Sequence, residues 1–134
     1  NIYGSWYEMS LYTKNGYNID SEISIKYGGD KGKYYHNNFS AYGIGIEYNG
    51  RLYLGELGSL NSNISWQHNK EESDIRILPP EALNGLTIGE NINASTRVNY
   101  FFNKDMSISF SVSFINNYRY NNLITVLGEF RAYL

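Results

Sequence analysis

The sequence predicts an all-β domain, an antiparallel up-and-down meander that closes into a β-barrel, with a β-sandwich as the alternative. Three observations predict it. Apolar and polar residues alternate with a period of two over most of the chain, and no helical stripe of apolar residues appears. Turn-forming residues separate the alternating segments. The 134 residues contain no linker or low-complexity block, which predicts a single domain over 1–134.

Seven segments carry the alternation, and each is predicted to be a strand. They are 2–12, 17–27, 41–48, 52–68, 92–102, 106–114 and 124–134. The most regular is 106–114, in which Met, Ile, Phe, Val and Phe alternate with serines. A transmembrane barrel needs at least eight strands. The eighth is expected in 74–78, or outside the chain if this is a piece of a larger barrel.

Turn chemistry predicts the connections between these strands. Asn15-Gly16 and Asn49-Gly50 are hairpin signals, because both residue types tolerate a positive φ. Residues 103–105 form a third tight turn. Longer polar links are expected at Gly28–Asn38, Asn69–Asn91 and Asn116–Asn122. Short and long connections therefore alternate along the chain, as in a meander.

The alternation has two interpretations. In a soluble barrel or sandwich the apolar face points inward, whereas in an outer-membrane barrel it meets lipid. Charged residues are only 18%, against roughly 25% in an average domain, and the polar faces carry mainly Ser, Gly and Asn. Tyr17 and Tyr27 lie roughly 33 Å apart along a strand, which at a tilt of about 40–45° approaches the 25 Å apolar band of a barrel. These features favour the membrane.

The stretch Arg97–Leu134 resembles the terminal hairpins of Gram-negative outer-membrane β-barrels, such as autotransporter translocator domains and small porin-like proteins. It shares with them an aromatic-ending strand, a tight Asn/Lys/Asp turn, an alternating strand, a loop and a Gly-containing last strand. The resemblance implies insertion into the outer membrane with Arg97, Glu129 and Arg131 in the lumen. A second resemblance lies at Gly4–Glu8, which is similar to the Gly-x-Trp-Tyr signature of lipocalins. It implies a soluble, secreted cup whose closed end is plugged by Trp6.

Exposed Tyr and Trp side chains are the best candidates for ligand binding, because they stack on sugar rings and enter interfaces at low entropic cost. The candidates are Trp6, Trp66, Tyr34, Tyr35, Tyr118 and Tyr120.

Several functions are not expected. A net charge of −2 and the lack of a Lys/Arg cluster argue against nucleic-acid binding. Two histidines and no cysteine predict neither a metal site nor a cofactor. Ser65 and His68 are three residues apart and point to opposite faces of one strand, so they do not form a nucleophile–base pair. His36 is interpreted as a solvated loop residue.

The sequence therefore predicts a non-enzymatic outer-membrane or cell-surface barrel that acts as a pore, an adhesin or a translocator, with membrane lipid as its partner. Its lumen is expected to be lined by Glu22, Glu47, Arg97, Glu129 and Arg131. The alternative is a secreted, soluble barrel or sandwich that binds a glycan or an apolar small molecule through Tyr and Trp. A third hypothesis is a subunit of an extracellular assembly, and the oligomeric state stays open.

Overall fold

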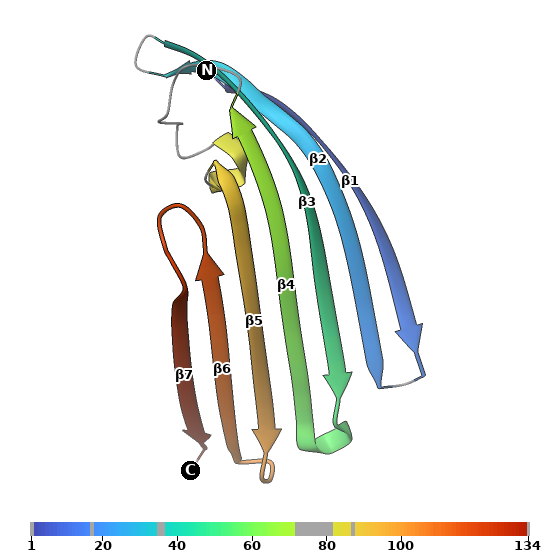
Figure 1. Cartoon of the computed structure of the whole chain (residues 1–134). Helices are drawn as coiled ribbons and strands as arrows, with labels where there is room; N and C mark the ends of the chain where they lie inside the picture. The colour runs from blue at the N-terminus through green and yellow to red at the C-terminus, as the bar shows by residue number, and fades with distance from the viewer. Residues whose placement is uncertain (1, 17, 35–36, 72–81, 87, 134) are drawn as a thin grey trace.

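The computed structural model describes residues 2–16, 18–34, 37–71, 82–86 and 88–133. They form one antiparallel sheet of seven strands in the order β1-β2-β3-β4-β5-β6-β7, so the predicted all-β meander is confirmed. The strands are β1 (Ile2–Asn15), β2 (Ile19–Tyr34), β3 (Asn37–Tyr53), β4 (Gly58–Glu71), β5 (Gly89–Phe101), β6 (Met106–Asn116) and β7 (Leu123–Ala132). Two short 3-10 turns, η1 (Gly55–Leu57) and η2 (Ala82–Gly85), lie on either side of β4. Figure 1 shows the strands side by side in sequence order, with β1 and β7 at the two edges.

Two of the predicted turns are confirmed. Gly16 follows β1 with a φ of 65°, a left-handed conformation that glycine adopts without strain. Between β5 and β6, the Asn103 side-chain oxygen accepts hydrogen bonds from the backbone N–H of Asp105 and Met106, at 2.8 and 3.0 Å. This contact fixes the turn because an Asn side chain can replace a backbone acceptor.

The hairpin predicted at Asn49-Gly50 is wrong, because β3 runs through it to Tyr53. Gly50 instead leaves room for the side chain of Tyr48: a Cβ on this glycine would lie 2.7 Å from the Tyr48 hydroxyl. That hydroxyl reaches the Ser21 hydroxyl on β2, at 3.2 Å. The real turn follows at η1, where Gly55 has a φ of 65°.

The long link predicted at Gly28–Asn38 is also wrong, since β2 extends to Tyr34 and β3 begins at Asn37. Gly28 is a strand residue that lies against β1, and a Cβ there would be 2.2 Å from the Ser5 carbonyl oxygen. The eighth strand proposed at 74–78 falls outside the described residues.

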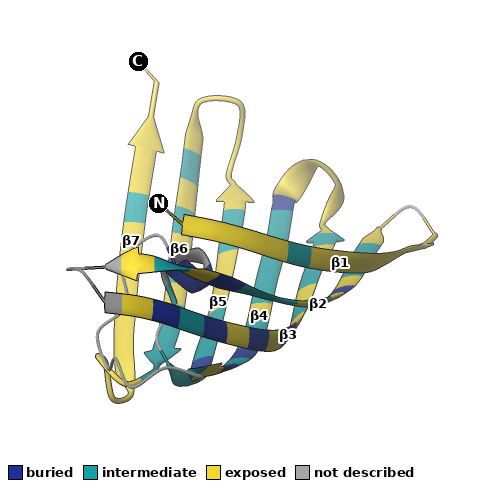
Figure 2. Cartoon of the chain, turned by 90° about the horizontal axis from the view of Figure 1, so that it is seen from above, coloured by how far each residue is buried: buried dark blue, intermediate teal, exposed yellow. Residues whose placement is uncertain are grey.

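The sheet is strongly coiled, and the strand direction turns from β1–β3 to β4–β7 (Figure 2). Most buried residues gather at the end of the sheet where η2 lies (Figure 2). The buried apolar residues are few: Phe39, Ala41, Ala82 and Leu83. The buried polar residues are Ser24, Asp30, Gln67, Asn69 and Asn91. The fold is therefore held by its strand ladders and a polar interior more than by an apolar core.

Candidate functional site: the concave polar face

The two faces of the sheet are inverted relative to a water-soluble sheet, and β3 shows this most clearly. Ala41, Gly43 and Gly45 are buried, whereas the alternate residues Tyr42, Ile44 and Ile46 are 44%, 51% and 46% exposed. Side chains alternate between faces along a strand, so one face is small or polar and covered, and the other is apolar and open. We call them the concave polar face and the outer face.

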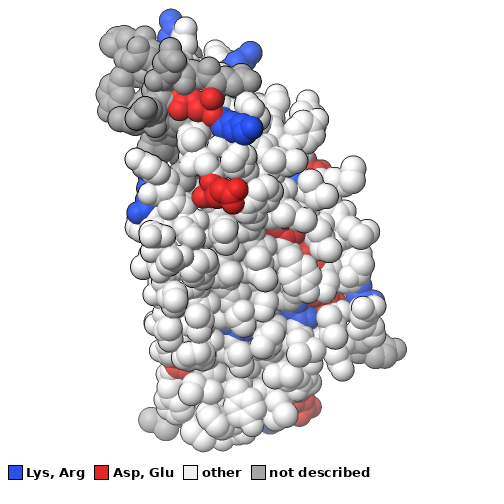
Figure 3. Space-filling view, in the orientation of Figure 1, with Lys and Arg blue, Asp and Glu red and all other residues white. Residues whose placement is uncertain are grey.

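The register extends the outer face over all seven strands. Its exposed apolar residues include Tyr7, Met9, Leu11, Ile23, Ile25, Tyr27, Ile44, Ile46, Ile64, Ile108, Phe110, Val112, Ile124, Val126 and Phe130. Among the described strand residues, the charged side chains at outer-face positions are Lys31, Lys33, Lys70 and Glu90, all at the upper ends of their strands. In the view of Figure 3 most of the surface is uncharged, and many of the charged side chains gather at its upper end.

The uncharged part of the outer face has a defined height. On β3 it runs from Tyr42 to Leu52, ten residues or roughly 33 Å of strand, which a tilt of about 40° reduces to about 25 Å. Tyr rings stand at its upper limit, where Tyr7 stacks on Tyr27 with ring centres 5.3 Å apart. Tyr100 and Phe102 make an edge-to-face contact at the lower end, at 5.1 Å.

Amide side chains form a hydrogen-bonded network across the concave polar face. Asn49 donates to Glu47 at 2.8 Å, and Asn63 on β4 donates to the same carboxylate at 3.3 Å and to the Asn49 oxygen. Higher up, Gln67 donates to Asn69 at 2.8 Å within a fully covered region. A buried polar face is stable only when its groups are paired in this way.

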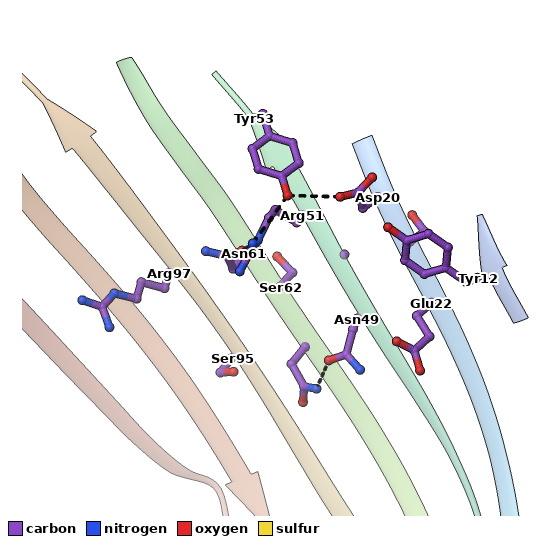
Figure 4. Close-up of a pocket in the computed structure, with 13 residues that line it drawn as sticks. Tyr12, Asp20, Glu22, Asn49, Arg51, Tyr53, Asn61, Ser62, Ser95 and Arg97 are labelled. Carbon is purple, nitrogen blue, oxygen red and sulfur yellow. Dashed lines mark hydrogen bonds between the residues drawn. The ribbon is translucent and has the colours of Figure 1, made fainter. Parts of the chain in front are cut away.

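A hollow of about 430 Å³ lies in the lower part of the concave polar face, between β1 and β5 (Figure 4). Tyr53 donates to Asp20 at 3.1 Å, and Arg51 donates to Asn61 at 2.6 Å and to the Tyr53 hydroxyl at 3.5 Å. Arg97 on β5 lines the same hollow, and its guanidinium points away from Arg51 and Tyr53 (Figure 4).

The upper part of the concave polar face is covered by η2. The Leu83 side chain is completely buried, and its backbone N–H donates to Asp30 Oδ2 at 2.6 Å. Asp30 Oδ1 accepts from the Trp6 indole at 3.2 Å. One carboxylate therefore ties β1, β2 and the β4–β5 connection together.

All five residues predicted to line an interior lie on the concave polar face. Glu22 lies beside the hollow, and Glu47 is part of the amide network. Arg97 donates to Ser109 at 3.5 Å. Glu129 and Arg131 on β7 form an ion pair with each other.

The predicted ligand-binding residues are not brought together. Trp6 lies on the concave polar face, whereas Trp66 lies on the outer face, where its indole donates to Glu90 at 2.9 Å and its ring stacks on His68. Tyr118 and Tyr120 lie on the β6–β7 connection and are 91% and 51% exposed. The side chain of Tyr34, and Tyr35 and His36 altogether, fall outside the described residues.

Three residues of the polar interior were missed by the sequence reasoning: Asp30, Arg51 and Tyr53. Alternation gave a signal for each, because Asp30 shares its face with Glu22, and Arg51 and Tyr53 share theirs with Glu47. Asp30 was left out because it fell in a predicted link and Arg51 because it followed a predicted turn, whereas Tyr53 lay in the predicted strand 52–68 and was not singled out.

Within the described ranges, no group of three His, Cys, Asp or Glu side chains is arranged to hold a metal ion, and no helix is long and apolar enough to cross a membrane. Ser65 and His68 lie on opposite faces of β4, as expected.

No family model, curated protein or solved structure matches the chain.

Proposed function

We propose that this chain forms the wall of an outer-membrane-type β-barrel, with its outer face in lipid and its concave polar face towards an aqueous interior. One observation carries the proposal: the outer face presents large apolar side chains that are about half exposed, and among the described strand residues its charged side chains stand only at the upper ends of the strands. A contiguous apolar surface on a soluble monomer rarely exceeds a few hundred Å². Lipid would cover such a face without any protein partner.

The polar interior supports a passage for polar solutes or for a polypeptide, as a pore or translocator. Its charges are of both signs, and some are paired across or along the strands, as in Arg51–Asn61 and Glu129–Arg131. The chain is proposed to have no enzymatic activity, and any adhesive role would rest on the upper connections.

A second candidate is a soluble sandwich, in which another sheet covers the outer face. The confinement of all seven strands to one sheet leaves that face free for such a partner. The curl towards the polar side favours the barrel, because in a sandwich the two apolar faces would pack on each other.

The two tryptophans allow a direct test, since they lie on opposite faces. In vesicles whose phosphatidylcholine is brominated near the headgroup, the fluorescence of Trp66 alone (the Trp6→Phe variant) is expected to be quenched. The fluorescence of Trp6 alone (the Trp66→Phe variant) is expected to change little, because bromine quenches only on contact. Equal quenching of both, or quenching of neither, would contradict the proposed orientation.

Sedimentation velocity separates the two candidates. A lipid-facing wall is expected to aggregate in plain buffer and to become monodisperse in mild detergent. A single monodisperse species in buffer without detergent would exclude the membrane wall and favour the covered sandwich.

A further inference from the structure

The upper end of the outer face carries three lysines. Lys31 and Lys33 lie on β2, and Lys70 lies on β4. Lys31 is level with Ser40 on β3, and Lys70 is level with Tyr42 on the other side of the same strand. Two strand spacings and a two-residue offset put the Lys31 and Lys70 Cα atoms roughly 12 Å apart. Their flexible four-carbon side chains can converge on one anion over β3.

The three lysines form no ion pair with a residue in the described part of the chain. All three are exposed. Among the described residues, no carboxylate lies within ion-pair distance of any of them. The whole chain has a net charge of −2, so this gathering of positive charge is local.

The surface beside the lysines is hollowed. Two hollows of about 510 and 420 Å³ share Tyr3, Lys31 and Ser40 in their walls. Gly29 keeps the second one open, because β2 and β3 approach so closely there that a Cβ would lie 2.6 Å from the Ala41 carbonyl oxygen. Tyr3 and Tyr42 flank it as aromatic walls.

The uncharged band begins directly below this site. Tyr42 is followed on the same face of β3 by Ile44 and Ile46, both about half exposed. A ligand held by the lysines would therefore have a polar, anionic head at the level of the Tyr rings and an apolar surface beneath it. Tyr rings of membrane barrels lie at the level of the lipid headgroups.

We infer that Lys31, Lys33 and Lys70 form a binding site for the phosphate of an anionic lipid, whose acyl chains lie along β3. This inference rests on the proposed function, because it needs the outer face to meet a bilayer. A lysine near an anionic membrane surface contributes about 1 kcal/mol, which is roughly fivefold in affinity for each lysine. The apolar band below the site favours a lipid over free phosphate.

The test measures the fluorescence polarisation of a labelled short-chain phosphatidylglycerol, and of the matching phosphatidylcholine, on the full chain in a nonionic detergent. The wild-type protein is expected to bind phosphatidylglycerol at least about fivefold more tightly than phosphatidylcholine. The variant Lys31→Gln/Lys33→Gln/Lys70→Gln should lose this preference. The control Lys14→Gln/Lys26→Gln/Lys104→Gln removes the same charge elsewhere and should keep it. Circular dichroism checks that both variants retain their β structure.

Three results would overturn the inference. The first is a wild-type protein with no preference for phosphatidylglycerol, and the second is an equal loss in both triple variants, which would mean a general charge effect. The third is complete competition by inorganic phosphate, which would mean a phosphate site without lipid specificity. The orientation of the sheet in a bilayer is measured separately, by tryptophan quenching in phosphatidylcholine vesicles. A negative result for the lysine site therefore does not contradict the proposed barrel wall, and a negative result for the barrel wall is detected by the quenching experiment.

Discussion

A single charge at the middle of the outer face should reveal what that face contacts. Phe110 lies on β6, four residues from Met106 and four from Phe114, so about 14 Å of strand separates it from each. At a strand tilt of about 40°, this puts Phe110 about 10 Å in depth from either residue, near the middle of the band. Its outer-face neighbours are Val98 and Gly128, which offer no partner to a guanidinium.

The Phe110→Arg variant is therefore expected to lose about 2–4 kcal/mol of free energy of unfolding in a bilayer, the cost of an arginine at mid-depth on a lipid face. This is roughly 30-fold to 1000-fold in the unfolding equilibrium. Two control variants use the same strand. Met106→Arg at the rim should cost about 0–1 kcal/mol, and Ser113→Arg points to the concave polar face and should be similarly mild.

The assay is a denaturant titration of each variant in phosphatidylcholine vesicles, followed by tryptophan fluorescence. We expect a graded order, in which the free energy of unfolding of Phe110→Arg is well below the values for Met106→Arg and Ser113→Arg. A surface substitution in water usually changes stability by no more than about 0.5 kcal/mol. A value that small for Phe110→Arg, or a larger loss for Ser113→Arg, would refute the assignment of the outer face to lipid.

Three further predictions concern the interior and the edges of the sheet. In thermal melts, Gly43→Ala should destabilise the protein by about 1–3 kcal/mol, because its Cβ would lie 2.0 Å from the Asn69 side-chain oxygen. The control Gly128→Ala should leave the stability unchanged, because a Cβ there meets nothing within 4 Å. Asp30→Ala should lower the free energy of unfolding by about 1–3 kcal/mol, because it removes the acceptor of the buried Leu83 N–H. Limited proteolysis should then cut the β4–β5 connection faster than in the wild-type protein. An unchanged cleavage rate would contradict the proposal that Asp30 anchors this connection. In detergent, backbone amides of β1 and β7 should exchange with deuterium faster than those of β3 and β4, and uniform protection would mean that the two edges are already paired.

Periodicity predicted the strands well because a period of two follows directly from the geometry of a β-strand. It failed at the strand ends, where glycine was interpreted as a turn residue. Gly28 and Gly50 lie inside strands because a neighbouring backbone or ring occupies the space of a side chain. That neighbour comes from pairing between strands, which a local sequence pattern does not contain.

The candidate site was predicted in part for the same reason. Alternation was enough to assign Glu22 and Arg97 to one common face, since neither depends on a distant contact. The contact between Asp30 and Leu83 joins residues 53 positions apart, and nothing in either local segment indicates it. The opposite faces of Trp6 and Trp66 follow from the pairing between strands, which neither local segment contains.

The number of strands has a consequence for how this sheet would be completed if it forms the wall of a barrel. In an antiparallel sheet of seven strands, the first and the last run in the same direction, as the arrows of β1 and β7 do in Figure 1. Joining β7 to β1 directly would make a parallel seam, and so would a ring of copies that all stand the same way up in a membrane. Joining β1 to β1 or β7 to β7 of a second copy would be antiparallel, but only with that copy upside down.

Antiparallel closure therefore takes an odd number of additional strands between β7 and β1. One strand that runs opposite to both edges is the smallest solution, and it would bring the total to eight. Strand parity thus sets an arithmetic condition for any set of strands that closes this sheet into an antiparallel barrel, whatever its sequence.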